Sequence, residues 1–305
     1  MEKIKNVWVV ASGVSTINEL TCGAARLGDK VTLIYAGERA SAVNADKAYY
    51  LGGIGADASF VSYIPTVAAM AADSRPELIL LDSSKNGRLA ASFIAVACGT
   101  AVQTDASEIE VSGGAVLTKK MVYGGAATKT EKSGGTAVVC VGAGVFSAGE
   151  AKPAAEIEDV SVAADSRVKF IVKREKAGVN VNLAAAKRVV GVGRGLGDET
   201  DLALCRDFAA LLGAELGCTR PICEERQWMP KETYIGVSGV MVQPELYVAI
   251  GISGQVQHVV GINKSGTIIA IDKNEASPIF KACDYGIVGD LRKVVPALAK
   301  LMSRE

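Results

Sequence analysis

Short apolar runs alternate with longer amphipathic stretches along most of this chain. This alternation is typical of the strands of a parallel sheet, each followed by a helix that covers the sheet. In the first half, the expected strands and helices are Val7–Ala11, Ser15–Leu27, Lys30–Tyr35, Tyr63–Ala72, Leu78–Asp82 and Gly87–Cys98. The pattern therefore predicts an α/β protein.

After Gly99 the pattern changes to strands separated by glycine-rich turns such as Ser112-Gly113-Gly114. We expect these strands to form an antiparallel addition to the first sheet. They are Glu108–Val111, Ala115–Met121, Thr136–Cys140 and Val168–Val172. The stretch from Phe146 to Asp165 is rich in alanine, glutamate and proline and has little apolar periodicity, so it is expected to be a mobile surface excursion.

A second alternating series begins at Arg188. Its expected elements are Arg188–Val192, Asp198–Leu212, Glu215–Cys218, Leu246–Ile250, Gly254–Val260, Thr267–Ile271 and Leu291–Met302. A chain of 305 residues is long enough for two domains. We place the boundary near Asn182, which gives residues 1–182 and 183–305 as two doubly wound α/β domains.

The charge balance excludes two classes of partner. Lys plus Arg and Asp plus Glu both number 33, which leaves no excess charge for a phosphate backbone or an anionic bilayer. No apolar run approaches the length of about 20 residues that spans a bilayer, and Val7–Ala11 is too short for a signal peptide. We therefore expect a cytoplasmic protein without nucleic-acid partners or stable membrane insertion.

The seven cysteines are scattered and contain no C-x-x-C motif. Cys218 and Cys223 lie close in sequence, but His258 is the only histidine, and no further pair of cysteines completes a tetrahedral site. We expect reduced thiols and no metal centre.

A glycine-rich segment, Gly191-Val-Gly-Arg-Gly-Leu-Gly197, follows one expected strand and precedes a helix. Glycines at such a turn let backbone amides approach a pyrophosphate at the positive end of the helix dipole. With Glu215 about 20 residues on, the motif also fits a nicotinamide-binding unit. A plain glycine-rich turn is the alternative.

A second strand-to-helix turn, Gly251-Ile-Ser-Gly-Gln-Val-Gln-His258, offers Ser253 as an N-cap. If both turns lie at the carboxyl edge of one parallel sheet, they flank the crevice where doubly wound folds bind nucleotides. A structurally satisfied imidazole is the alternative for His258. No Ser-His-Asp grouping or paired carboxylate is recognisable, so no catalytic residue is predicted.

Two further loops carry polar groups between sharp turns. Cys218-Thr-Arg-Pro221 would present the Arg220 guanidinium at a sheet edge, or only a surface salt bridge. Tyr234-Ile-Gly-Val-Ser-Gly239 places the Ser238 hydroxyl between glycines, or forms a simple hairpin turn.

In order and spacing, these pieces resemble the C-terminal domain of electron transfer flavoprotein alpha subunits. The resemblance covers roughly Arg188 to Leu301 and is carried by Pro244-Glu-Leu-Tyr247 through His258, by Asn274-Glu-Ala-Ser-Pro-Ile-Phe280 and by Asp284-Tyr-Gly-Ile-Val-Gly-Asp-Leu291. The first half resembles the family in layout and in short segments such as Tyr123-Gly-Gly125. The resemblance includes bacterial members that serve acyl-CoA and carnitine metabolism.

The resemblance implies FAD held mainly by the second domain, a Rossmann-like unit. Arg194 would lie near the phosphates, Arg220 against the isoalloxazine ring and Ser238 at flavin N5. Gln257 and His258 would reach the ribityl chain and the pyrimidine carbonyls, and Ser253 and Asp290 the ADP half. The full set of cofactor-binding residues implied is Arg194, Gly195, Thr219, Arg220, Val237, Ser238, Gly239, Gly251, Ser253, Gly254, Gln255, Gln257, His258, Asp272, Asp290 and Leu291.

Two positions depart from the family pattern, because Asp272 stands where many members have Asn and Val237 where many have Gln. A carboxylate at residue 272 could accept a hydrogen bond from a ribose or adenine, but it would repel a pyrophosphate.

The resemblance also implies partners: a beta subunit bound largely through the first domain, and an acyl-CoA dehydrogenase-type electron donor or acceptor. A cationic Arg220 or a donating His258 would stabilise the negative charge that a reduced flavin gains. The chain would then be an electron carrier rather than an enzyme. The alternatives are a nicotinamide-dependent oxidoreductase and a nucleotide-binding scaffold without electron transfer.

Overall fold

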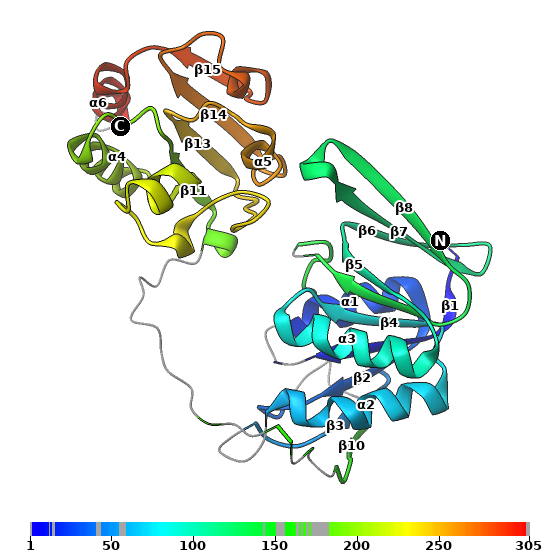
Figure 1. The fold of residues 1–305 in the computed structure, drawn as a ribbon. Helices are drawn as coiled ribbons and strands as arrows, with labels where there is room; N and C mark the ends of the chain where they lie inside the picture. The colour runs from blue at the N-terminus through cyan, green and yellow to red at the C-terminus, as the bar shows by residue number, and fades with distance from the viewer. Residues whose placement is uncertain are drawn as a thin grey trace. The chain divides into compact units, whose positions relative to one another are not determined.

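The computed structural model describes residues 2–11, 13, 16–40, 44–54, 59–142, 144–150, 156–162, 165, 167–168, 171 and 183–302. These residues form two compact units (Figure 1). The first comprises Met1–Val122 and Thr128–Arg174, and the second Tyr123–Ala127 and Glu175–Glu305. The predicted boundary near Asn182 lies outside the described residues.

The first unit is built on a seven-stranded sheet in the order β10-β3-β2-β1-β4-β9-β5, in which every neighbouring pair is parallel. The strands are β1 (Ile4–Ala11), β2 (Gly28–Tyr35), β3 (Lys47–Tyr50), β4 (Leu78–Asp82), β5 (Val102–Ala106), β9 (Ala137–Val141) and β10 (Ile157–Asp159).

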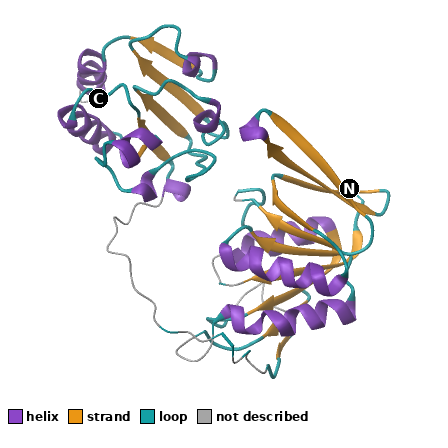
Figure 2. Cartoon of the chain, viewed as in Figure 1, coloured by secondary structure: helices purple, strands orange, loops and turns teal. Residues whose placement is uncertain are grey.

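Helices cover both faces of this sheet (Figure 2). They are α1 (Ile17–Leu27), α2 (Phe60–Ser74) and α3 (Lys85–Cys98). Successive residues of a strand point to opposite faces, so Val7 and Val9 pack against α1, whereas Trp8 and Val10 pack against α2 and α3. Burial on both faces explains why the strands read as continuous apolar runs.

The expected antiparallel addition to the first sheet is wrong in two respects. Thr136–Cys140 corresponds to β9, which is parallel to β4 and β5 and lies between them. All five residues of β9 are buried, as suits an interior parallel strand. The expected strands Glu108–Val111 and Ala115–Met121 correspond to β6 (Glu108–Ser112) and β7 (Ala115–Val122), which are antiparallel and form a separate three-stranded sheet with β8 (Ala127–Ser133), a strand that was not expected.

The expected strand Val168–Val172 is not formed at Val168 or Ile171, and its other three residues lie outside the described part of the chain. Within the predicted surface excursion, Ile157–Asp159 forms β10, which pairs with β3 at one edge of the sheet. A run of three residues with two acids gives too weak a periodicity for a strand to be expected.

The second unit contains a five-stranded parallel sheet in the order β12-β11-β13-β14-β15. The strands are β11 (Arg188–Val192), β12 (Glu215–Cys218), β13 (Leu246–Ile250), β14 (Thr267–Asp272) and β15 (Tyr285–Val288). The order reverses between β11 and β13, which makes this pair the topological switch point of a doubly wound sheet. The predicted fold class is confirmed.

Helices α4 (Glu199–Leu211) and α6 (Leu291–Met302) cover one face of the second sheet, through a core that includes Val190, Val192 and Ile250. Asp198 caps α4, because its carboxylate accepts hydrogen bonds from the amides of Thr200 and Asp201.

The opposite face is covered mainly by loops, short turns and α5 (Val256–Val259). The expected helix from Gly254 to Val260 is wrong in length. Gly254 has a φ of +81° and Gln255 is extended, so helical geometry begins only at Val256. Among the described helices, none has the length and hydropathy needed to cross a membrane.

Candidate functional site

The two glycine-rich loops meet at the switch point. The amide of Gly193 donates to the carbonyl of Ile250 at 3.0 Å, and the amide of Gly195 donates to the carbonyl of Gly251 at 2.9 Å. A Cβ on Gly195 would lie 2.7 Å from the Cα of Gly251, whose φ of +62° is itself in the left-handed region. Glycine is therefore required at both positions, because side chains would force the loops apart.

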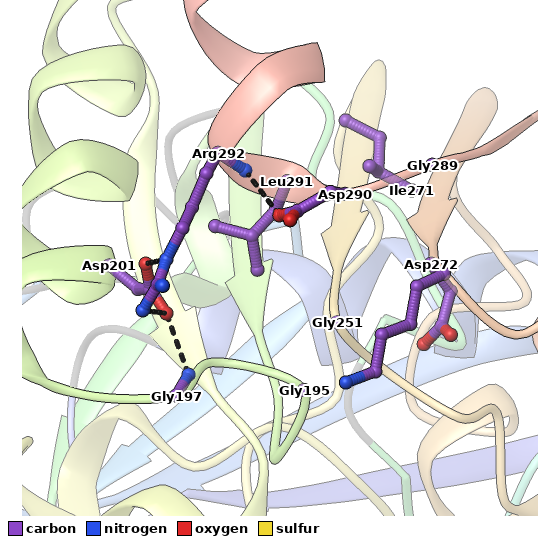
Figure 3. Close-up of a pocket in the computed structure, with 11 residues that line it drawn as sticks. Gly195, Gly197, Asp201, Gly251, Ile271, Asp272, Gly289, Asp290, Leu291 and Arg292 are labelled. Atoms are coloured by element: carbon purple, nitrogen blue, oxygen red, sulfur yellow. Dashed lines mark hydrogen bonds and ion pairs between the residues drawn. The ribbon is translucent and has the colours of Figure 1, made fainter.

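A cleft of about 620 Å³ opens over these loops at the carboxyl edge of the sheet. It is lined by most of the residues expected to bind a cofactor: Arg194, Gly195, Thr219, Arg220, Gly251, Ser253, Gly254, Gln255, Gln257, His258 and Asp272. An adjoining pocket of about 190 Å³ shares Gly195, Gly251 and Asp272 with the cleft and adds Asp290 and Leu291 (Figure 3). Of the predicted set, Val237, Ser238 and Gly239 line neither cavity.

Arg220 nevertheless contacts Ser238, which is far from it in sequence. The Arg220 Nη2 atom donates to the Ser238 hydroxyl at 3.3 Å, and the Tyr234 hydroxyl lies 3.3 Å from the same oxygen. The guanidinium also pairs with Glu224 at 3.3 Å and lies 5.5 Å from the centroid of the Tyr234 ring. The structure thus joins two predicted site residues at one side of the cleft.

The imidazole of His258 is buried, with both nitrogens hydrogen-bonded inside the protein. Nδ1 lies 3.2 Å from the carbonyl of Ile235, which can only accept, so Nδ1 carries the proton. Nε2 lies 3.0 Å from the Tyr247 hydroxyl and therefore accepts from it. Burial lowers the pKa of His258 to about 4, so the ring is neutral at pH 7. A contact between His258 and a flavin carbonyl stays a prediction.

Asp272 and its neighbours give the cleft mixed charge. The Asp272 carboxylate accepts from the amide of Asn274 at 2.8 Å and lines both cavities. Arg194, Arg226 and Lys273 line the cleft as cations. Arg226 donates to the carbonyl of Leu196 at 2.6 Å and lies 4.4 Å from the centroid of the Trp228 ring, which fixes its guanidinium beside the glycine loop.

Sequence reasoning missed Arg226, Lys273 and Tyr247. Lys273 directly follows Asp272, a residue of the predicted set at the end of β14, and this position is the signal that could have placed it at the cleft. Tyr247 is the second residue of an expected strand, where side-chain alternation places it on the face opposite Leu246 and Val248. Arg226 lies in an irregular segment that carries no periodic signal.

The position of Glu215 argues against a nicotinamide site. Glu215 is the first residue of β12 and pairs with Val189 at the start of β11, whereas the cleft lies at the opposite, carboxyl ends of these strands. The ribose-binding acid of a dinucleotide fold lies near the carboxyl edge. Glu215 therefore does not fill that role.

The cysteines are free thiols, and Cys140, Cys205 and Cys218 are buried. Burial raises the pKa of each of these three to about 12, so their thiolates are scarce at neutral pH. In the described part of the chain, no group of His, Cys, Asp or Glu side chains is arranged to hold a metal ion.

Comparison with known proteins identifies both halves of the chain. Residues 16–165 match the electron transfer flavoprotein domain, and residues 182–263 match the electron transfer flavoprotein FAD-binding domain. A structural comparison also returned a Mycobacterium smegmatis enzyme described as thiamin diphosphate-dependent. It covers 96% of this chain and 59% of that chain at 11% identity, and its TM-score of 0.25 establishes no common fold.

Curated relatives are similar over the full length of both chains. YdiR of Escherichia coli K12, which carries an electron transfer flavoprotein subunit name, is 37% identical over 312 residues, covering 100% of each chain. The FixB proteins of Salmonella typhimurium LT2 and Escherichia coli O157:H7 are 36% and 35% identical over 313 residues, also covering 100% of each chain. The chain therefore belongs to the electron transfer flavoprotein family as an alpha-type subunit with a C-terminal FAD-binding domain.

Proposed function

We propose that this chain carries FAD in the cleft of its second unit and shuttles electrons from an acyl-CoA dehydrogenase-type donor to a redox partner, as one half of a cytoplasmic heterodimer. It performs no substrate turnover of its own. The observation that carries the proposal is the cleft at the β11–β13 switch point. Arg220 lines this cleft and contacts Ser238.

The residues of the cleft fit a dinucleotide. The Thr219 hydroxyl is buried in the described structure without a hydrogen-bond partner, and Thr219 lines the cleft, so a ligand atom could satisfy it. The contact between Gly195 and Gly251 leaves backbone close to the ligand space, as a pyrophosphate requires. Cationic side chains of the cleft supply compensating charge.

The proposed assignment divides the cofactor between the two cavities. Arg194, Arg226 and Lys273 would compensate the diphosphate, and Ser253 would donate a hydrogen bond. Asp272 and Asp290, which line the smaller pocket, would accept from the adenosine half. Arg220 and Ser238 would face the isoalloxazine ring. When bound, FAD supplies a ring that accepts and releases electrons one or two at a time.

The side chains support charge stabilisation rather than acid–base catalysis. Arg220 keeps a permanent positive charge, and the Ser238 hydroxyl next to it can donate or accept as its partner requires. His258 has a neutral ring whose pKa lies well below 7. A site of this kind tunes a redox potential without transferring protons to a substrate.

The partner subunit is proposed from the family. YdiR is named as a subunit, and the whole chain aligns with it. We propose that a beta subunit completes the carrier and binds mainly to the first unit.

The first test is an absorption spectrum of the chain co-expressed with a beta subunit encoded in the same genome. A yellow heterodimer that releases FAD on denaturation, and that is reduced and reoxidised without other substrates, is the expected result. A colourless heterodimer that takes up no added FAD would favour a nucleotide-binding scaffold. Binding of NAD with turnover of a small substrate would favour an oxidoreductase.

The donor is tested separately. Mixing the yellow heterodimer with an acyl-CoA dehydrogenase and its acyl-CoA should bleach the FAD absorbance. If dithionite reduces the FAD but the acyl-CoA dehydrogenase does not, the chain would still be an electron carrier, and the proposed class of donor would be wrong.

A further inference from the structure

Three segments of the second unit line the smaller pocket of about 190 Å³, together with the single residues Gly251 and Asp201 (Figure 3). They are the glycine loop at Gly195–Gly197, the end of β14 at Ile271–Lys273 and the start of α6 at Gly289–Arg292. A backbone hydrogen bond of 3.0 Å from Gly289 to Asp272 joins the last two segments. Backbone hydrogen bonds also join Gly195 to Gly251 and Gly251 to Ile271, so the side of the pocket between the glycine loop and α6 depends on a side-chain contact.

That contact is made by the side chain of Arg292. Its Nε donates to Asp201 Oδ1 at 2.6 Å, and its Nη2 donates to Asp201 Oδ2 at 3.2 Å and to Asp198 Oδ2 at 3.0 Å. Asp201 Oδ2 also accepts from the amide of Gly197 at 2.7 Å. Within the described structure, these bonds are the polar links between the first turn of α6 and the start of α4. The Asp201 carboxylate also holds the glycine loop, through the amide of Gly197.

Burial makes the link depend on Arg292. The Asp201 side chain is 4% exposed, and a buried carboxylate without its cationic partner is costly. Hydrogen bonding to Arg292 lowers the pKa of Asp201 below its usual value. A Cβ on Gly197 would lie 3.2 Å from both Arg292 Nη2 and Asp201 Oδ2, so the glycine lets the loop approach the pair closely.

We propose that Arg292 is a positioning residue for the adenosine diphosphate half of the cofactor. The inference rests on the proposed function, which places FAD in these cavities. Arg292 acts through Asp201 on the amide of Gly197 and so holds the glycine loop at the distance from α6 that the adenosine half requires. The ring-side residues Arg220 and Ser238 lie on other segments, where Arg220 contacts Ser238 and Glu224 rather than this cluster.

The test compares the full-length wild-type chain with Arg292→Gln after removal of bound flavin. We expect the Kd for FAD to rise about tenfold, as loss of a charge-assisted hydrogen bond to a buried group would produce. The inhibition constant of ADP as a competitor should rise by a similar factor. The visible spectrum and midpoint potential of the FAD that does bind should stay unchanged, because the ring-side residues are untouched.

Four matched variants make the comparison specific. Asp201→Asn should weaken the binding of FAD and of ADP to the same degree as Arg292→Gln. Arg292→Lys should retain part of the affinity, since a lysine can contact only one carboxylate well. Lys293→Gln removes the adjacent exposed cation of α6 and should change neither Kd. Val295→Ala removes a buried core contact of the same helix and lowers stability without touching the cluster.

Two outcomes would overturn the inference alone. One is an unchanged Kd for FAD in Arg292→Gln, and the other is an equal loss of affinity in Val295→Ala at matched stability. A wild-type chain that binds neither FAD nor ADP would instead overturn the proposed function and the inference with it.

Discussion

The hydroxyl of Tyr247 donates to Nε2 of His258 across 3.0 Å, in the core beneath the first glycine loop. Tyr247 is fully buried, and its hydroxyl also occupies the space that a side chain at Gly191 would need. One phenol thus satisfies the Nε2 atom of the histidine, whose tautomer the Ile235 carbonyl sets, and explains the glycine within β11.

Gly191→Ala should destabilise the second unit by about 2–3 kcal/mol, because the new methyl group would overlap the Tyr247 ring in a packed core. Denaturant unfolding of the full chain measures the change. Gly134→Ala, at a position where a Cβ meets nothing within 4 Å, is the control and should have little effect. An unchanged unfolding free energy for Gly191→Ala would show that Tyr247 is not packed there.

The stability of the second unit should fall as the pH is lowered from about 6.5 to about 4. His258 titrates near 6.5 when unfolded and at about 4 when folded, so between these values the unfolded state binds more protons. The contribution is fully present above pH 6.5, and its loss is worth about 3 kcal/mol by pH 4. His258→Gln should flatten the pH dependence of the unfolding free energy in this window. If the unfolding free energy of the wild type and of His258→Gln has the same pH dependence, a group other than His258 titrates in this window.

Periodicity predicted the second unit well because its interior strands are buried on both faces. Leu246–Ile250 and Arg188–Val192 form interior strands with the predicted bounds, and Leu291–Met302 forms the predicted helix. Both glycine turns follow an expected strand and precede a helix, and this order puts them at the carboxyl edge if the strands are parallel. The order of the strands, and hence the contact of Gly195 with Gly251, follows from tertiary packing that no local pattern contains.

Elements with weak or short patterns were not predictable. β10 has only three residues, and the place of β9 between β4 and β5 depends on tertiary packing. The cluster of Asp198, Asp201 and Arg292 joins residues more than 90 positions apart. Its members look like ordinary helix-end charges until the fold brings α4 and α6 together.

Ser238→Ala should leave FAD bound but shift its one-electron potential. The Ser238 hydroxyl contacts Arg220 and Tyr234 rather than supporting the fold, so its loss should not weaken binding strongly. If the hydroxyl interacts about 1 kcal/mol better with one redox state, the potential moves by roughly 40 mV. Spectroelectrochemical titration measures it, and an unchanged potential would remove Ser238 from the flavin site.

Arg220→Ala should lower the midpoint potential of the bound FAD, because a nearby cation favours the reduced, more negative ring over the oxidised one. The side chain is about half exposed, so solvent screens its charge. We therefore expect a shift on the order of 40 mV rather than the several-fold larger value of a buried pair.

Two variants decide whether that shift is local. Arg220→Lys keeps the charge and should keep most of the potential, even though it loses the fork geometry that reaches Ser238 and Glu224. Arg206→Ala removes an exposed cation of α4 that does not line the cleft and should leave the potential unchanged. Equal shifts in Arg206→Ala and Arg220→Ala would mean that the flavin senses only the net charge of the unit. A shift confined to Arg220→Ala places the guanidinium beside the ring.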